Sequence, residues 1–292
     1  MRAPVGEVGK TAYDVVLGRG VAAIRGNDFL LQTLLKLKEC KYWGKVSAGS
    51  TFDSITSEIL KSTLISMPAI EEQIKIGDFL SSVDKLITLH QRKLEALKKL
   101  KRTLLQKMFP KKGHLKPELR FFGFTNDWEQ RKLNEIASIY DGTHQTPRYT
   151  SNGIPFLSVE NITTLQSSKF ISEKDFLRDF PVYPKKGDVL LTRIGDVGTA
   201  NVYERNQKVA FYVSLALLKL RETDPYFVNA SFRSNSTRKE VWKRTLHIAF
   251  PKKINKNEIG KVNIQIPSLA EQRKIGIFFY SLDRLITLHQ RE

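Results

Sequence analysis

Two polar stretches and one arginine have side chains suited to binding a nucleic acid. Asp141–Tyr149 reads Asp-Gly-Thr-His-Gln-Thr-Pro-Arg-Tyr, and Pro251–Lys256 reads Pro-Lys-Lys-Ile-Asn-Lys. Arg can pair with guanine and Gln with adenine, while Thr and Tyr bind phosphate. Arg193 precedes a glycine-rich turn. A solvated turn is the alternative for each stretch, and a local salt bridge is the alternative for Arg193. The predicted contact residues are Thr143, His144, Gln145, Thr146, Arg148, Tyr149, Arg193, Lys252, Lys253 and Asn255.

Two further patterns are faintly similar to those of nucleotide-binding enzymes. Pro4–Thr11 is one residue from a phosphate-binding loop, in which Lys10 would bind phosphates and Thr11 a magnesium ion. A proline replaces its first glycine, no strand can precede it, and a related segment later in the chain lacks the lysine. Asp224–Phe227 is similar to the Asp-Pro-Pro-Tyr adenine-binding motif of methyltransferases, without its second proline or a glycine-rich cofactor loop. We therefore predict neither an NTPase nor a methyltransferase.

The composition favours a polyanionic partner. The 292 residues carry a formal net charge of +18, and the excess is spread along the chain. Each phosphate that a basic side chain neutralises releases a counterion, so such a protein suits DNA, RNA or an anionic membrane surface. A single cysteine, Cys40, excludes a disulfide framework and a multi-cysteine metal site. No apolar run has the length of a membrane helix or a signal peptide, so we expect a cytoplasmic protein.

An internal repeat is the strongest signal in the sequence. Residues 67–92 and 266–291 are identical at 16 of 26 positions, including an unbroken Leu-Ile-Thr-Leu-His-Gln-Arg. The preceding segments also correspond, since Val5–Gly9 resembles Ile194–Gly198 and Glu58–Lys61 resembles Glu258–Lys261. The repeated unit is therefore a globular segment followed by a helix. Residues 1–66 match only the back half of the second globular segment, so we expect a chain that is truncated at both ends relative to its own repeat.

Each repeat is expected to end in a long helix that begins near a proline. Pro68 and Pro267 suit helix starts, Ser268 and Glu271 form a capping-box pattern, and acidic residues lie near the positive end of the helix dipole. A helix from Ala69 to Met108 would be about 60 Å long. Apolar residues at heptad spacing predict that the two helices pair as a coiled coil. Its predicted positions are Leu80, Val83, Ile87, His90, Leu94, Leu97, Phe279, Leu282, Ile286 and His289.

The two histidines of this seam and its apolar end need separate interpretation. His90 and His289 occupy equivalent positions, and we interpret them as polar residues that fix the register, with metal binding or a pH switch as the alternative. Leu94, Leu97, Leu104 and Met108 would lack a partner within the chain. The sequence therefore predicts that they drive self-association or bind another subunit.

The second globular segment is predicted to be a mixed α+β domain. The stretch after Pro110 has the composition of a linker. Residues 154–159, 188–193 and 209–213 have the pattern of strands separated by glycine turns, and Asp224–Leu246 has that of a helical stretch. The predicted domains are therefore residues 1–66, 67–110, 111–266 and 267–292.

Four motifs in these segments resemble a known family. "DWEQRKLNEIA", "IPFLSVENI", "GDVLLTRIGDVG" and "IP-x-x-x-EQ" before a long helix resemble the target-recognition domain and spacer helix of type I restriction–modification specificity subunits. The resemblance implies an α+β fold in which recognition domains alternate with spacer helices that pair as an antiparallel coiled coil. Each recognition domain would read one half of a split site on double-stranded DNA, and the helices would set the unread gap.

The same resemblance implies the partners and the absence of catalysis. The spacer would dock two methyltransferase subunits, which hold S-adenosylmethionine and methylate adenine at N6, and a restriction subunit would join the complex. This chain would hold no catalytic residue, metal or cofactor. The incomplete first recognition domain and shortened second helix put the first half-site and the spacer in doubt. Two alternatives stay open: a non-catalytic coiled-coil assembly protein, and a half-subunit that homodimerises to read a palindromic split site.

Overall fold

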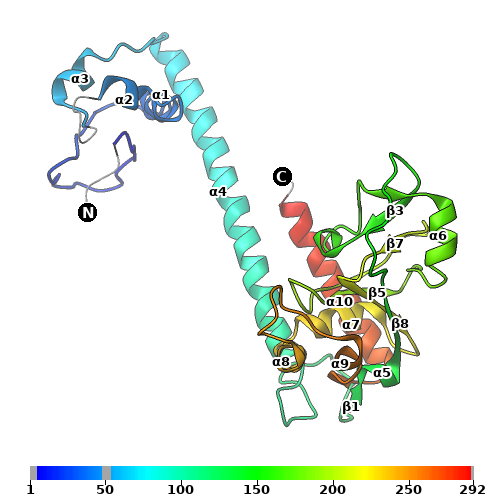
Figure 1. Cartoon of the computed structure of the whole chain (residues 1–292). Helices are drawn as coiled ribbons and strands as arrows, with labels where there is room; N and C mark the ends of the chain where they lie inside the picture. The colour runs from blue at the N-terminus through cyan, green and yellow to red at the C-terminus, as the bar shows by residue number, and fades with distance from the viewer. Residues whose placement is uncertain (1–4, 48–53, 291–292) are drawn as a thin grey trace. The chain divides into compact units, whose positions relative to one another are not determined.

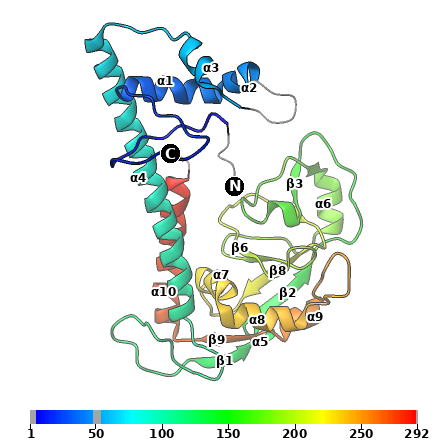
Figure 2. The ribbon, with the colours of Figure 1, turned by 90° about the vertical axis from the view of Figure 1, so that its left-hand side faces the viewer.

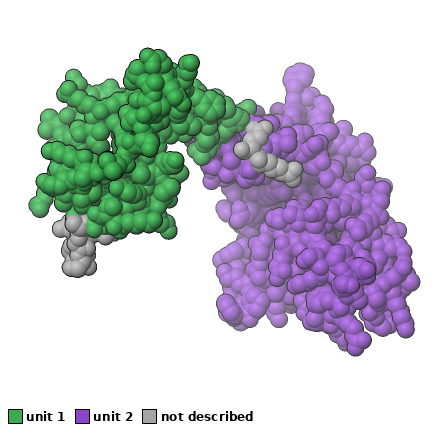
Figure 3. All heavy atoms as spheres, turned by 90° about the horizontal axis from the view of Figure 1, so that it is seen from above, with its two compact units in different colours: residues 1–93 green, residues 94–292 purple. Residues whose placement is uncertain are grey.

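The chain divides into two compact units joined by one long helix. The computed structural model describes residues 5–47 and 54–290. Unit 1 comprises Met1–Lys93 and unit 2 comprises Leu94–Glu292 (Figure 3). Helix α4, Ile70–Lys107, begins in unit 1 and ends in unit 2 (Figure 1). Its 38 residues correspond to about 57 Å, so the predicted long helix is confirmed.

Unit 1 is helical in its described residues. It contains the first part of α4 and three shorter helices: α1 Asp28–Glu39, α2 Tyr42–Val46 and α3 Ser57–Ser62. Trp43 of α2 is buried and packs against Gly6, where an added Cβ would lie 2.5 Å from the indole ring. This contact places the turn that contains Gly6 beside α2.

Unit 2 contains every strand that the structure describes. A four-stranded sheet has the order β2-β8-β5-β6, a three-stranded sheet β4-β3-β7, and a two-stranded sheet β1-β9. Figure 2 shows β1 beside β9. Strands β3 and β7 are parallel and the other pairs are antiparallel. The strands are β1 Glu129–Lys132, β2 Ala137–Asp141, β3 Ile154–Leu157, β4 Phe170–Ile171, β5 Val189–Thr192, β6 Ala200–Val202, β7 Ala210–Phe211, β8 Leu215–Leu220 and β9 Asn263–Ile266. The helices are α5 Leu133–Ile136, η1 Val159–Asn161, α6 Glu173–Asp179, α7 Pro225–Arg233, α8 Asn235–Arg244, α9 Lys256–Gly260 and α10 Leu269–His289.

The four-stranded sheet separates two hydrophobic clusters. Side chains alternate between the faces of a strand. Val189 and Leu191 of β5 accordingly pack in one cluster with α7 and α10, while Leu190 packs in the other with β3 and α6. All three predicted strands are present, and the α+β prediction is confirmed. The predicted helical stretch 224–246 is divided into α7 and α8 at Ser234, which is the last cap of one helix and the first cap of the other.

The Gln of the repeated Pro-x-x-x-Glu-Gln motif forms the same joint in both units. In unit 2, Gln272 donates to the carbonyl oxygen of Pro267 at 2.9 Å and accepts from the backbone N–H of Asp224 at 3.0 Å. In unit 1, Gln73 donates to the carbonyl of Pro68 at 2.8 Å and accepts from the side chain of Asn27 at 3.1 Å. The motif therefore connects α4 to the N-terminus of α1, and α10 to the N-terminus of α7, by hydrogen bonds.

Each joint also requires a glycine. Asn27 caps α1 and Asp224 caps α7, so the spacer helix crosses a capped N-terminus in both units. A Cβ on Gly77 would lie 2.7 Å from the backbone nitrogen of Phe29, and one on Gly276 would lie 2.4 Å from a carboxylate oxygen of Asp224. Real Cβ contacts are longer than this, so only glycine allows this helix packing.

The motif glutamates Glu72 and Glu271 lie in the first turns of α4 and α10, near the positive end of the helix dipole as predicted. Glu271 has a further contact. Glu271 is fully buried and its two carboxylate oxygens each accept a 2.7 Å hydrogen bond from Arg120, which lies between α4 and β1. Glu72 is exposed. The predicted capping box is half formed: Ser268 accepts from the N–H of Glu271 at 3.4 Å, and the prolines precede the helices by two residues.

Candidate nucleic-acid interface

The three predicted contact segments meet at one end of the four-stranded sheet. Strand β2 ends at Asp141 opposite Ala216, and β5 ends at Thr192 opposite Leu215, so both strands end beside the start of β8. The loop after β2 and the turn after β5 therefore leave the sheet together. The segment before α9 joins them, because the N–H of Ile254 donates to the carbonyl of Arg193 at 2.9 Å.

Arg193 lies at the centre of this junction. Its side chain is only 9% exposed, forms an ion pair with Asp141 and donates to the carbonyl oxygen of Ile254 at 3.2 Å. Lys256 lies 3.8 Å from the second carboxylate oxygen of Asp141. This is the local salt bridge that the sequence left open as the alternative for Arg193. Its geometry suits positioning of the two polar loops more than contact with a ligand.

The first polar loop exposes most of the predicted contact residues. His144, Gln145, Thr146 and Arg148 are all exposed. Thr143 is half-buried, and its hydroxyl accepts from the N–H of Gln145 at 3.3 Å.

The two ends of this loop are held by the domain. A Cβ on Gly142 would lie 2.3 Å from the carbonyl oxygen of Phe211, so the chain passes close to β7 at this point. Tyr149 is 44% exposed and packs edge-to-face on buried Phe156, with 5.8 Å between ring centres. The loop therefore presents four exposed polar side chains between two anchored ends.

The second polar loop is fixed by backbone hydrogen bonds and exposes its charges. Gly195 donates to the carbonyl of Lys252 at 2.8 Å, and Leu246 donates to that of Lys253 at 2.7 Å. Lys252, Lys253 and Asn255 are exposed. Neither lysine forms an ion pair with a carboxylate in residues 5–47 or 54–290. Both ammonium groups are therefore available to an anionic ligand.

A groove beside this loop contains basic residues that sequence reasoning missed. It has a volume of about 750 Å³, and its walls are the glycine-rich turn 195–200 and one face of α8. Arg238, Lys239 and Trp242 line it from α8, together with Lys252, and Asp196 is its acidic lining residue. Trp242 is 66% exposed. The predicted helical stretch Asp224–Leu246 already contained this signal, because positions 238, 239 and 242 lie on one face of a helix.

The predicted spacer residues divide between the two units. In unit 1, Val83 and Ile87 are exposed and Leu80 is half-buried. In unit 2, Phe279 and Leu282 are buried, whereas Leu94, Leu97 and Ile286 are half-buried. His90 and His289 are half-buried. Coiled-coil pairing along the whole predicted seam stays a prediction.

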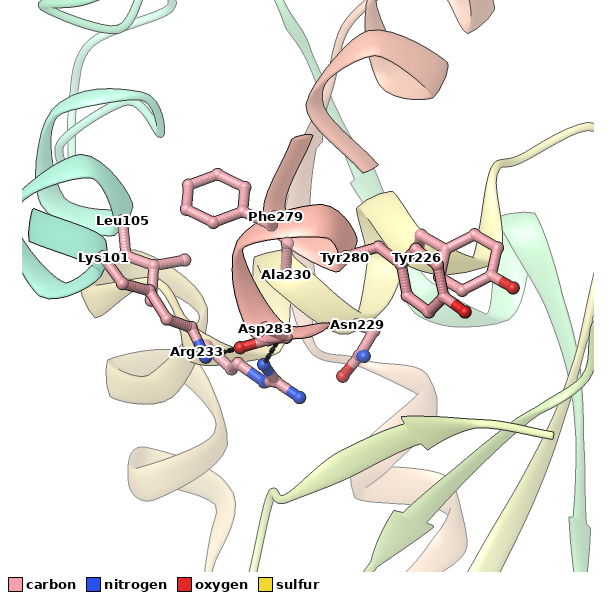
Figure 4. A pocket seen from close by; sticks show the side chains of 9 residues that line it. All are labelled: Lys101, Leu105, Tyr226, Asn229, Ala230, Arg233, Phe279, Tyr280 and Asp283. Atoms are coloured by element: carbon pink, nitrogen blue, oxygen red, sulfur yellow. Dashed lines mark hydrogen bonds and ion pairs between the residues drawn. The ribbon is translucent and has the colours of Figure 1, made fainter. Parts of the chain in front are cut away.

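Helices α4 and α10 run antiparallel where they meet within unit 2. Phe109, just after α4, packs against Phe279, with ring centres 6.0 Å apart. Eight residues earlier in the chain, Lys101 pairs with Asp283, which also pairs with Arg233 of α7 (Figure 4). Burial lowers the pKa of Lys101, and so does the nearby Arg233.

The prediction that Leu104 and Met108 lack a partner within the chain is wrong. Met108 is 3% exposed and belongs to the main hydrophobic cluster of unit 2, and Leu104 packs against the same cluster. The sequence assigned these residues to a partner outside the chain because the heptad pattern runs on beyond α10. Helix α4 instead ends inside the hydrophobic core of unit 2.

The two enzyme-like motifs have structural roles. Lys10 forms an ion pair with Asp28, and the hydroxyl of Thr11 donates to the carbonyl of Tyr13. Pro4 lies outside the described residues. Asp224 is the cap of α7: its carboxylate accepts from the N–H of Phe227 at 2.8 Å, and burial raises its pKa.

The described part of the chain has neither a candidate metal cluster nor a candidate membrane-spanning helix. Residues 5–47 and 54–290 contain no group of three or more His, Cys, Asp or Glu side chains able to hold a metal ion. In the same part of the chain, no helix is long and apolar enough to cross a membrane.

Comparison with known protein families identifies the family of this chain. The family model described as "Type I restriction modification DNA specificity domain" matches residues 1–99 and 125–292. The chain therefore belongs to the family of type I restriction–modification specificity subunits.

Individual relatives agree with this assignment. The type I restriction enzyme MjaVIII specificity subunit of Methanocaldococcus jannaschii is 26% identical over 91% of this chain and 66% of that protein. The MjaIX specificity subunit of the same organism is 30% identical over 59% of this chain and 44% of that protein. The chain thus spans about two thirds of the first relative's length.

Solved structures show the same fold. The HsdS subunit from Thermoanaerobacter tengcongensis aligns with a TM-score of 0.55 and 22% identity, over 90% of this chain and 64% of that one. The S subunit of a type I restriction–modification system from M. genitalium aligns with a TM-score of 0.59 and 16% identity, over 90% of this chain and 67% of that one.

Proposed function

We propose that this chain is a non-catalytic, sequence-specific DNA-recognition subunit of a type I restriction–modification complex, acting on DNA in the cytoplasm. The observation that carries the proposal is the junction at Arg193, which brings two exposed polar loops and a basic groove to one end of a sheet. The exposed donors of the first loop suit base edges, and the lysines of the second suit phosphates.

The proposed partners follow from the family. A methyltransferase subunit would supply the N6-adenine chemistry, and a restriction subunit would join through the complex. The antiparallel contact of α4 with α10 supports a spacer role, because it fixes the long helix to the recognition domain. The predicted domain boundaries at residues 66, 110 and 266 are part of the same proposal.

The deciding experiment is a methylation map. The full chain is co-expressed with a methyltransferase subunit from the same locus, and host DNA is sequenced for N6-methyladenine. We expect methylation within a split motif that is absent when the methyltransferase is expressed alone. Stable subunit binding without a motif would contradict sequence recognition, and no subunit binding at all would contradict the complex.

A specific observation favours one variant of this function. Every strand in the described residues belongs to unit 2. The sheet end with its two polar loops therefore occurs in unit 2 and not in residues 5–47 or 54–93. A homodimer would then read both half-sites with unit 2 of each copy. This variant predicts a palindromic split motif, whereas a non-palindromic motif would contradict it.

A further inference from the structure

An apolar loop tip beside the basic groove has no role in the fold of the domain. Ile248 is 99% exposed and Phe250 is fully exposed, and Leu246 and Trp242 beside them are 41% and 66% exposed. Isolated exposed apolar residues are ordinary, but a cluster of this kind marks a site of interaction. The cluster lies between α8 and the lysines of the second polar loop.

The base of this loop is fixed although its tip is exposed. The N–H of Leu246 donates to the carbonyl of Lys253 at 2.7 Å, which closes the loop. The ring of His247 hydrogen-bonds to the carbonyl of Trp242 at 2.8 Å, and its ring centre lies 4.6 Å from that of Trp242. Directly after the loop, Ile254 is completely buried. The tip is therefore held out from the surface by an anchored base.

The charge around the tip favours a nucleic acid as its partner. Arg238, Lys239 and Lys252 line the adjoining groove, and Lys253 lies at the base of the loop. None of these four forms an ion pair with another residue of the described ranges. Apolar side chains flanked by cations are the arrangement with which proteins unstack a base step while they hold the adjoining phosphates.

We propose that Ile248 and Phe250 form a wedge that inserts between base pairs of the bound duplex and kinks it, while the neighbouring groove holds the phosphate backbone. The proposal rests on the proposed DNA-recognition function and adds deformation to it. Insertion costs least at flexible pyrimidine–purine steps such as TA and CA. The wedge would therefore add a preference for such a step at a position where no side chain reads a base edge.

The test compares binding with DNA distortion. The full chain, assembled with its methyltransferase subunit, selects duplexes from a random pool. The enriched duplex is labelled at its ends for energy transfer and carries 2-aminopurine at successive positions. We expect the unsubstituted complex to shorten the end-to-end distance and to raise 2-aminopurine fluorescence at one step. The double variant Ile248→Ala and Phe250→Ala should lose both signals and bind roughly ten- to a hundredfold more weakly, the range that burial of one large apolar side chain provides.

The controls separate this proposal from the function on which it rests. Leu177→Ala removes a 66% exposed side chain on α6 of the same unit and should leave both signals unchanged. If one duplex is enriched but the double variant distorts it as much as the unsubstituted complex does, the wedge proposal is overturned. It is also overturned if the unsubstituted complex does not distort the enriched duplex. In both cases the proposed DNA recognition is not contradicted. Failure to enrich any sequence overturns both. Loss of methyltransferase binding in the double variant would show that the tip contacts protein and would also overturn the wedge.

Discussion

Breaking the buried ion pair between Glu271 and Arg120 should destabilise unit 2 and not unit 1. The pair is bidentate, with two 2.7 Å hydrogen bonds, and the two side chains are 1% and 14% exposed. Removing one partner of a buried pair costs about 3–5 kcal/mol, against about 0.2–1 kcal/mol for an exposed pair. Arg120 retains some access to solvent, so we expect the free energy of unfolding of Glu271→Ala to fall by about 3 kcal/mol. For a unit of this size, that corresponds to a melting temperature lower by about 6–12 °C.

The internal repeat supplies a matched control for this variant. Glu72 occupies the equivalent motif position but is exposed, so Glu72→Ala should change the free energy of unfolding by less than about 0.5 kcal/mol. Urea unfolding of unit 2 is followed through the fluorescence of Trp128, which is 1% exposed, in a Trp43→Phe, Trp242→Phe background. Circular dichroism of the same samples also reports the unfolding of unit 1, which contains Glu72. Equal stability of the two alanine variants, or a loss below about 1 kcal/mol for Glu271→Ala, would refute the buried-pair argument.

Three other substitutions test the helix cap at Asp224, the ion pairs of Asp283 and the junction at Arg193. Asp224→Asn should keep the cap on α7, because asparagine caps as well as aspartate does. Burial raises the pKa of Asp224 above 3.8, so the folded chain binds this proton more tightly, and its free energy of unfolding falls as the pH rises above 3.8. Urea titrations from about pH 4 to pH 7 should show that the free energy of unfolding falls in the original chain as this carboxyl ionises. The Asp224→Asn variant should not show this part of the fall. Asp283→Ala should lower the free energy of unfolding by about 1–3 kcal/mol at pH 7. Burial and Arg233 lower the pKa of Lys101 below 10.5, so the loss should shrink as the pH approaches 10.5, which thermal unfolding at two pH values measures. Arg193→Met should broaden the methylated motif more than it weakens binding to random-sequence duplexes, and equal losses in methylation mapping and anisotropy would contradict its positioning role.

Patterns that depend on local periodicity were predicted well from the sequence. The three strands 154–159, 188–193 and 209–213, the long helix and the helical stretch after Asp224 all carry their own signal, because side-chain periodicity reflects burial directly. The α+β class followed from the order of these elements. The duplication also identified the Gln of the motif as part of a repeated unit, although its hydrogen bonds were not foreseen.

Features that depend on contacts distant in sequence were missed. The heptad pattern alone could not show that Met108 and Phe109 enter the core of unit 2, because their partners Trp128, Phe227 and Phe279 lie far along the chain. The basic face of α8 went unnoticed although a helical stretch was predicted there, because the groove forms only where α8 lies beside the turn 195–200, a contact distant in sequence. The DNA-contact assignments of the ten predicted side chains stay predictions.

The duplicated joint has a consequence for exchanging parts of this protein. Gln73 and Gln272 each donate to a proline carbonyl and each accept from the cap residue of a neighbouring helix, from the side chain of Asn27 and the backbone N–H of Asp224. Gly77 and Gly276 allow the close crossing in both joints. A segment that runs from one joint to the next therefore enters and leaves on matching backbone geometry. Such a segment is modular: another sequence with the same two ends could replace it without a change in how the spacer helices are fastened.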